Sequence, residues 1–250
     1  MTPDISVVVP LYDEESNVEP LYHELTAVMR ALDRSYELIL VDDGSRDGTF
    51  PRLAAVCARD PHVRVIRFSR NFGQTAAFAA GFAHARGRWI VTSDGDLQND
   101  PADIPRLLDV ARDHDIVCGW RKYRKDAYLT RQLPSVVANW LLGIASGIPL
   151  HDNGCSLKVF RAEVVKPLAL APGMHRYLPA LASQLGGRVA EVVVNHRPRR
   201  FGRSKYGLSR TCGVVCDIVR LRQLMRQAVE RTGPAPRLYE IAEMIEGAPH

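Results

Sequence analysis

Residues 89–103 read WIVTSDGDLQNDPAD, and they begin with four apolar or β-branched residues that predict a buried strand. Two carboxylates follow, Asp94 and Asp96, and Gly95 between them lets the backbone turn sharply enough for both to face one point. Acids at the C-terminal end of a parallel strand lie where open α/β sheets bind ligands. Together with Gln98 they present hard oxygen ligands, which suit Mg²⁺ or Mn²⁺ bound with phosphate oxygens. A single motif of this kind is more often a capped turn, so its interpretation depends on the rest of the chain.

The chain before this stretch alternates between strands and helices. Segments rich in apolar and β-branched residues predict strands at residues 5–9, 38–41 and 63–68, and helices are predicted at 18–32, 50–59 and 74–85. Further strands are expected at 116–119 and 189–194. This alternation predicts an α/β fold with a Rossmann-like, mostly parallel central sheet flanked by helices. No GxGxxG motif follows the first strand, so the fingerprint of dinucleotide binding is missing.

Polar side chains follow each of the first four predicted strands. They are Tyr12 and Glu14 after the first, Asp42 and Asp43 after the second, Asn71 and Gln74 after the third, and Asp94 and Asp96 after the fourth. Because the C-terminal ends of parallel strands share one edge of a sheet, these residues are expected to form one site. A carboxylate such as Asp42 or Glu14 can bind a ribose hydroxyl or a base N–H, which favours a nucleotide as the ligand.

The composition indicates one substantial core and an uneven distribution of charge. The chain has 250 residues, 46% of them hydrophobic, so one domain is expected. Residues 1–118 carry a net charge of −7 and residues 119–250 one of +12, which favours a polyanionic partner such as a phosphorylated substrate, an anionic membrane surface or nucleic acid. The five cysteines form no CxxC pair and no signal peptide precedes the first strand, so a cytoplasmic protein with reduced thiols is expected.

The second half of the chain differs in character from the first. Residues 120–131 are basic, and residues 134–146 predict an apolar helix of about 20 Å, too short to cross a bilayer core of about 30 Å. Residues 151–158 are expected to form a polar loop. An amphipathic helix is predicted at 211–231, and the proline-containing tail at 232–250 is expected to be loosely attached, which leaves residues 1–210 as the main domain.

Five motifs of this chain resemble those of family-2 glycosyltransferases with the GT-A fold, close to the polyprenyl- and dolichyl-phosphate sugar transferases such as dolichyl-phosphate mannosyltransferase. They are VVPLYDE at 8–14, VDDGSRDGT at 41–49, RNFGQ at 70–74, DGDLQ at 94–98 and GRSKY at 202–206. All five occur in the order and spacing of the family. Each is weakly specific alone, whereas five in register between residue 5 and about residue 210 are strongly specific.

The resemblance implies a role for each matching residue. Pro10, Tyr12, Glu14 and Asp43 would line the nucleoside pocket with Asp42 beside it, and Asn71 and Gln74 complete the expected donor site. Asp94, Asp96 and Gln98 would coordinate Mg²⁺ or Mn²⁺ with the donor diphosphate. Arg121, Arg131 and Ser135 match residues that grip the acceptor phosphate, and Arg199 and Lys205 match a basic closing loop. Asp96, Arg121 and Arg131 are then the expected catalytic residues, with the nucleotide-sugar half at 1–118 and the acceptor half at 119–210.

One absent group indicates the nature of the nucleophile. Family-2 enzymes that act on hydroxyls usually carry an acidic pair after the polar loop, where an acid serves as general base, but residues 172–178 of this chain read PGMHRYL. A phosphate monoester is already anionic at pH 7, so it needs cations to position it rather than a base. His175 could act as a base, or it could be packed or contact a phosphate.

Together with the residues above, the resemblance implies a metal-dependent, inverting transfer of a hexose from a GDP- or UDP-sugar to a polyprenyl phosphate, either dolichyl or undecaprenyl phosphate. Many relatives continue into two transmembrane helices where this chain has an acidic tail, so a peripheral enzyme at the cytoplasmic membrane face is expected. The same difference leaves open a hydroxyl of a small molecule or secondary metabolite as the acceptor. An inactive protein of the same fold is a further alternative, whereas nucleic-acid binding is disfavoured because aromatic residues are not interleaved with the basic runs.

Overall fold

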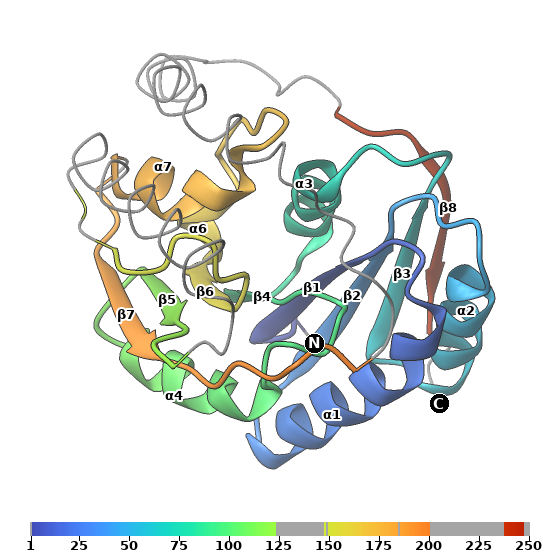
Figure 1. The fold of residues 1–250 in the computed structure, drawn as a ribbon, viewed down its shortest axis with the longest axis horizontal. Helices are drawn as coiled ribbons and strands as arrows, with labels where there is room; N and C mark the ends of the chain where they lie inside the picture. The colour runs from blue at the N-terminus through green and yellow to red at the C-terminus, as the bar shows by residue number, and fades with distance from the viewer. Residues whose placement is uncertain (1, 124–147, 149, 185, 201–237, 248–250) are drawn as a thin grey trace.

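The computed structural model describes residues 2–123, 148, 150–184, 186–200 and 238–247. They build one eight-stranded sheet in the order β7-β5-β6-β4-β1-β2-β3-β8 (Figure 1). The strands are β1 (Ile5–Leu11), β2 (Tyr36–Asp42), β3 (Val63–Phe68), β4 (Trp89–Thr92), β5 (Ile116–Trp120), β6 (Lys158–Arg161), β7 (Val189–Val193) and β8 (Ile241–Glu246). Only β6 and β8 run antiparallel to the strands they pair with. The predicted α/β fold with a mostly parallel sheet is confirmed.

Helices cover both faces of this sheet (Figure 1). One face carries α1 (Val18–Ala31), α2 (Thr49–Arg59) and α4 (Ile104–Val110), and the other carries α3 (Gln74–His84), α6 (Ala162–Val165) and α7 (Leu178–Gln184). In the described part of the chain, short 3-10 helices at Glu15–Asn17, Pro101–Asp103 and Met174–Tyr177 lead directly into α1, α4 and α7. Each face has its own apolar core, because successive side chains of a strand point to opposite sides. Val7 and Val9 of β1 thus pack in one core and Val8 in the other.

Small residues bring α3 close to the sheet. A Cβ atom on Gly81 would lie 2.1 Å from Cγ1 of Val8, so only glycine permits this approach between the helix and β1. The start of α3 consequently lies beside the C-terminal ends of the central strands. The helix begins at Gln74, and its first turn lies near the polar residues that follow the central strands, since Gln74 contacts Asp94 after β4.

The expectation of a loosely attached tail is wrong for residues 238–247. Strand β8 pairs antiparallel with β3, and the register places Glu243 opposite Arg67 and Glu246 opposite Arg64. Opposite charges on facing positions of paired strands stabilise the pairing. The acids that suggest a solvated tail are therefore cross-strand partners, and β8 covers what would otherwise be an open edge of β3.

Strand β6 is a second element that the prediction lacks. It lies between β4 and β5 and is antiparallel to both. Lys158 at its start is buried, and its Nζ donates hydrogen bonds to the backbone carbonyls of Asn153 and Cys155, which replace the water that a lysine normally binds. The predicted helices at 134–146 and 211–231 lie outside the described residues.

Candidate functional site

Asp43 joins the end of β2 to the loop that follows β3. Its carboxylate accepts hydrogen bonds from the backbone N–H of Phe72 (2.7 Å, Oδ1) and of Gly73 (2.9 Å, Oδ2). Its own N–H donates to the carbonyl of Leu11 at the end of β1 (2.8 Å). The side chain is thereby fixed between three strand ends, and only 3% of Asp43 is exposed.

Asp42, the preceding residue, is fully buried and accepts a hydrogen bond from the N–H of Ser45 (3.1 Å). Gly44, which follows Asp43, has a φ of +69°, and a Cβ on it would lie 2.3 Å from the carbonyl carbon of Arg70. Glycine is thus required for the turn after β2 to lie against the loop after β3. The two loops are therefore in direct contact at this edge.

Burial raises the pKa of both carboxyls. The pKa of Asp43 is raised to about 6, mainly by burial and further by Asp42, although the N–H groups of Phe72 and Gly73 oppose the shift. Burial also raises the pKa of Asp42, and the hydrogen bonds of Ser45 counteract it. Among the described residues, the cation that pairs with these acids is Arg67, whose Nε lies 3.8 Å from Oδ2 of Asp42. Two adjacent buried acids with so little compensating charge indicate a site for a polar ligand rather than a stabilising feature.

A pH dependence of stability follows from Asp43. An acid whose pKa is higher in the folded state contributes stability that is present at low pH and is lost as pH rises through about 6. Relative to Asp43→Asn, which cannot titrate, the wild type is expected to gain about 2 kcal/mol as pH falls from 7 to 4.5. Urea unfolding at both pH values measures this gain, and a difference between the two proteins that stays constant with pH would contradict the assignment.

The loop after β1 lies beside the same edge. The N–H of Glu14 donates to Oγ1 of Thr49 (2.8 Å), and the N–H of Asp13 donates to Oγ of Ser45 (2.9 Å), so the first residue of α2 and the loop before it hold this loop. The Glu14 carboxylate also accepts a hydrogen bond from Nδ2 of Asn17. Pro10 and Tyr12 are half-buried at the end of β1, in the positions expected from the sequence.

Asp94 and Asp96 follow β4, as the sequence predicts, and each is held by a residue from another element. Nε2 of Gln74, at the start of α3, donates to Oδ1 of Asp94 (2.6 Å). Nη2 of Arg199 lies 2.7 Å from Oδ2 of Asp96, and its Nη1 lies 3.8 Å from Oε1 of Glu14. Arg199 thus links the ends of β1 and β4.

The backbone of this loop is strained. Leu97 has a φ of +62°, which an L side chain rarely adopts, and the N–H of Gln98 donates to Oδ1 of Asp96 (3.1 Å). Nε2 of Gln98 donates to the carbonyl of Arg197 at 3.4 Å, so its side chain lies toward the segment 196–200. Backbone strain of this kind, next to two acids, is typical of a ligand site.

The charges of the loop fit a divalent cation. Burial raises the pKa of Asp96 to about 6, the negative charge of Asp94 raises it further, and the N–H of Gln98 and the guanidinium of Arg199 oppose the shift. Two carboxylates whose charges repel each other attract a cation, and Mg²⁺ commonly binds one or two carboxylates together with substrate phosphates. Within the ranges that the structure describes, no group of three or more His, Cys, Asp or Glu side chains is arranged to hold a metal ion.

Arg121 lies at the end of β5 and forms a two-pronged ion pair with Asp152. Nε lies 2.7 Å from Oδ2 and Nη2 lies 2.9 Å from Oδ1, and the backbone N–H of Arg121 donates to Oδ2 as well. Burial lowers the pKa of the guanidinium, but Asp152 more than offsets this, so the pKa is raised and the group stays charged. Of the other residues expected to bind the acceptor, Arg131, Ser135 and Lys205 lie outside the described part of the chain.

His175 is held by the same helix that holds Asp94. Its Nδ1 lies 2.7 Å from Oγ1 of Thr75, which also accepts a hydrogen bond from the N–H of Gly173 (3.0 Å). The segment 172–178 is therefore fastened to the first turn of α3, next to Gln74. Its sequence brings no carboxylate to the site, and its one imidazole has a hydroxyl partner.

Asp152 and Arg197 are two contacts of the site that the sequence does not predict as such. Asp152 is predicted only as part of a polar loop, yet it orients Arg121. Arg197 lies between Glu24 of α1 and Asp100, at 2.6 Å from each, and so holds the segment that carries Arg199. Their partners lie 31 or more residues away along the chain, and no local pattern indicates such pairs.

Comparison with known proteins shows the family of this chain. Residues 6–168 match the family model described as Glycosyl transferase family 2. The chain is 45% identical over 228 residues to the dodecaprenyl-phosphate galacturonate synthase of Rhizobium johnstonii, covering 89% of this chain and 68% of that protein. It is 38% identical over 218 residues to the undecaprenyl-phosphate 4-deoxy-4-formamido-L-arabinose transferase of Yersinia pestis, covering 86% and 66%. The chain thus spans about two thirds of the length of these relatives.

The fold is shared with a solved enzyme. The structure of glucosyl-3-phosphoglycerate synthase from Mycobacterium tuberculosis in complex with Mn²⁺ and uridine-diphosphate-glucose superposes with a TM-score of 0.67. The match covers 88% of this chain and 79% of that one, at 22% sequence identity. At this identity the likeness concerns the architecture. Among the described helices, none combines the length and apolar character needed to cross a bilayer.

Proposed function

Since this chain belongs to glycosyl transferase family 2, and is therefore a glycosyltransferase with the expected GT-A fold, we propose that it transfers a sugar from a nucleoside diphosphate sugar to a polyprenyl phosphate. The names of the two relatives at 45% and 38% identity, each a polyprenyl-phosphate enzyme, support the acceptor class. The observation that carries the donor class is the pair of acids after β4, with Arg199 of a distant segment against Asp96. A nucleic-acid partner or an inactive fold explains neither the names of these relatives nor the acids after β4.

The donor nucleoside is proposed to lie over the ends of β1 and β2. Asp43 is fixed by two backbone N–H groups, and each of its oxygens has a further lone pair for an N–H or O–H of the nucleoside. Pro10, Tyr12 and Glu14 would line the pocket, with Asp42, Asn71 and Gln74 completing it. A rigid carboxylate binds a nucleoside with little loss of entropy, so the loops act as a preformed cradle.

Asp94, Asp96 and Gln98 are proposed to hold a divalent cation, Mg²⁺ or Mn²⁺. When bound, such an ion neutralises the charge that develops on the leaving diphosphate. The presence of Mn²⁺ beside uridine-diphosphate-glucose in the mycobacterial enzyme of the same fold supports this choice. Gln74 fixes Asp94, and Arg199 balances the charge of Asp96. Arg199 is close enough to this loop to contact a phosphate of the donor or of the acceptor.

The acceptor phosphate is proposed to act as the nucleophile without a general base. A phosphate oxygen attacks the anomeric carbon as the bond from that carbon to the diphosphate breaks, which inverts the configuration. The phosphate oxygen is already ionised at pH 7, so no side chain has to remove a proton from it. Arg121, whose guanidinium plane is fixed by Asp152, is proposed to position it together with Arg131, Ser135 and Lys205. The lack of a carboxylate at 172–178 disfavours a hydroxyl acceptor.

We place the reaction at the cytoplasmic membrane face, where a polyprenyl phosphate would present its head group. The net charge of +12 on residues 119–250 supports a peripheral contact, since basic surfaces are attracted to anionic lipids. This attraction is screened by salt, so membrane association is expected to weaken as ionic strength rises.

A transfer assay tests the proposed function. The protein is incubated with Mn²⁺, undecaprenyl phosphate in detergent and, in turn, UDP- and GDP-sugars, and lipid-linked sugar is detected by mass spectrometry. One donor is expected to give product. EDTA should abolish product formation, because no cation then stabilises the charge that develops on the leaving diphosphate. Undecaprenol, which has the same chain but no phosphate, is the matched control. Product with undecaprenol or with a small-molecule alcohol, and none with the phosphate, would contradict the proposal.

A further inference from the structure

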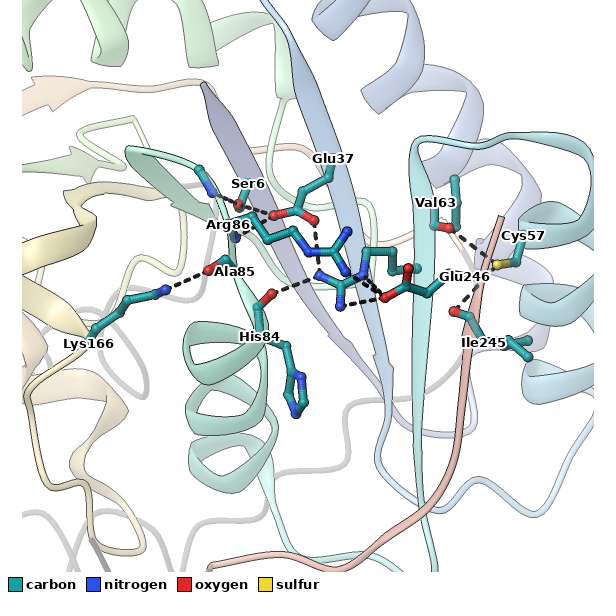
Figure 2. Close-up of polar contacts among 12 residues, drawn as sticks. Ser6, Glu37, Cys57, Val63, His84, Ala85, Arg86, Lys166, Ile245 and Glu246 are labelled. Atoms are coloured by element: carbon teal, nitrogen blue, oxygen red, sulfur yellow. Dashed lines mark hydrogen bonds and ion pairs between the residues drawn. The ribbon is translucent and has the colours of Figure 1, made fainter. Parts of the chain in front are cut away.

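Strand β8 is fastened at its C-terminal end to a buried arginine. Oε1 of Glu246 lies 2.9 Å from Nη2 of Arg64 and 2.8 Å from Nη2 of Arg86 (Figure 2). Arg64 is itself held by Glu37 (3.0 Å) and by the carbonyl of His84 (2.7 Å), so it cannot move with the strand. These contacts lie at the N-terminal end of β3, away from the acids of the site. They fix where β8 ends.

Because β8 is antiparallel to β3, its beginning lies at the opposite end of β3, next to the site. The residues just before it contact the chain that leaves β3. The N–H of Ser69 donates to the carbonyl of Glu240 (3.1 Å), and Oγ of Ser69 donates to its carboxylate (3.2 Å). The ring of Tyr239 stacks on that of Phe68 with centroids 5.0 Å apart and planes 10° apart.

The contacts continue from Tyr239 to Asp43. Phe68 meets Phe72 edge to face, with ring centroids 5.7 Å apart. Phe72 and Gly73 are the residues whose N–H groups hold the Asp43 carboxylate. An unbroken series of contacts thus runs from the C-terminal segment through two phenylalanines to the acid at the centre of the proposed nucleoside pocket.

We propose that Tyr239 is a positioning residue for nucleotide binding, which acts through Phe68 and Phe72 on Asp43. The loop at 69–73 has no regular structure of its own, so its N–H groups point at Asp43 only while the rings beside them are held. With β8 fixed at Glu246, Tyr239 is presented at a constant position. The inference rests on the proposed function in one respect, namely that the nucleotide occupies the Asp43 pocket.

The test compares three variants of the full chain. Tyr239→Ala removes the ring, Tyr239→Phe keeps it, and Met244→Ala changes a side chain of β8 that is 44% exposed. In Tyr239→Ala, the N–H groups of Phe72 and Gly73 are expected to exchange with deuterium about tenfold faster, and the Kd of the Mn²⁺–nucleoside diphosphate and the KM of the donor to rise about fivefold. The kcat should stay within about twofold, because the reacting groups are untouched. The other two variants should match the wild type.

Two outcomes would overturn the inference. One is wild-type exchange at Phe72 and Gly73 in a folded Tyr239→Ala protein. The other is faster exchange spread evenly over β3 and β8, since that describes a loosened strand and not a positioned loop. Should the alanine variant fail to fold, Tyr239→Leu, which keeps apolar volume without a stacked ring, decides between the same outcomes. If the wild type binds no nucleoside diphosphate, the proposed function fails, whereas the exchange rates still decide whether Tyr239 positions the loop.

Discussion

Replacing Asp96 by asparagine is expected to lower kcat/KM by about a thousandfold and, at the same time, to raise the Tm of the metal-free protein. Activity falls because the variant loses one of the two carboxylates that are proposed to hold the cation at the leaving diphosphate. Stability rises because burial and the charge of Asp94 raise the pKa of Asp96 to about 6, so that at pH 7.5 the ionised carboxylate is unfavourable in the folded state. Removing that charge should raise Tm by about 2 °C.

Asp100, four residues further along the chain, is the matched control. Its carboxylate is bound by Arg197 (2.6 Å) and by Nδ2 of Asn195 (3.0 Å), and although burial opposes the shift, these partners lower its pKa. Asp100→Asn should therefore lower Tm and, because Arg197 keeps its ion pair with Glu24 and so still holds the segment of Arg199, leave kcat/KM within a few-fold of the wild type. Thermal unfolding in EDTA and initial rates with Mn²⁺ measure both quantities. If the Asp96→Asn enzyme kept more than a tenth of the wild-type kcat/KM, this result would contradict the proposal that Asp96 binds the cation.

The central part of the fold can be predicted from the sequence because its signals are local. β1 to β4 are mostly buried on both faces, so each is rich in apolar and β-branched residues, and the predicted bounds of β3 and β4 agree with the structure. Their parallel order follows from the alternation with helices. It brings residues that are far apart in the sequence to one edge, as the hydrogen bond from Gln74 to Asp94 shows.

The elements that escape prediction depend on partners that are distant in the sequence. Glu246 looks like part of a solvated tail until Arg64, 182 residues earlier, is seen to bind it. Lys158 looks like a loop residue because its burial depends on backbone carbonyls that only the folded chain brings to it. Asp152 is similar, since its pairing with Arg121 depends on the end of β5 meeting a loop 31 residues later. Patterns of hydrophobicity report which face is buried, and they do not report which charges meet.

The ion pair of Arg121 and Asp152 is expected to have a large effect on stability because both side chains are mostly buried. The side chains are 13% and 6% exposed, so removing the carboxylate leaves a guanidinium buried without a partner. Asp152→Ala is expected to lower the free energy of unfolding by about 3 kcal/mol, measured by urea unfolding. The pair of Arg112 and Asp109, with a similar distance of 3.0 Å but exposures of 79% and 67%, is the matched control, and Asp109→Ala should change stability by less than about 0.5 kcal/mol.

The same pair separates stability from acceptor binding. Replacing both partners by apolar residues, as in Arg121→Met with Asp152→Leu, removes the unpaired charge and should recover most of the stability that Asp152→Ala loses. The double variant should not recover sugar transfer, because it lacks the Arg121 guanidinium that is proposed to position the acceptor phosphate. In Asp152→Ala the guanidinium of Arg121 remains but is no longer oriented by Asp152. The KM for undecaprenyl phosphate should therefore rise more than the KM for the donor. If the double variant transferred sugar at the wild-type rate, Arg121 would have only a structural role, and the acceptor phosphate would have to be positioned by other cations.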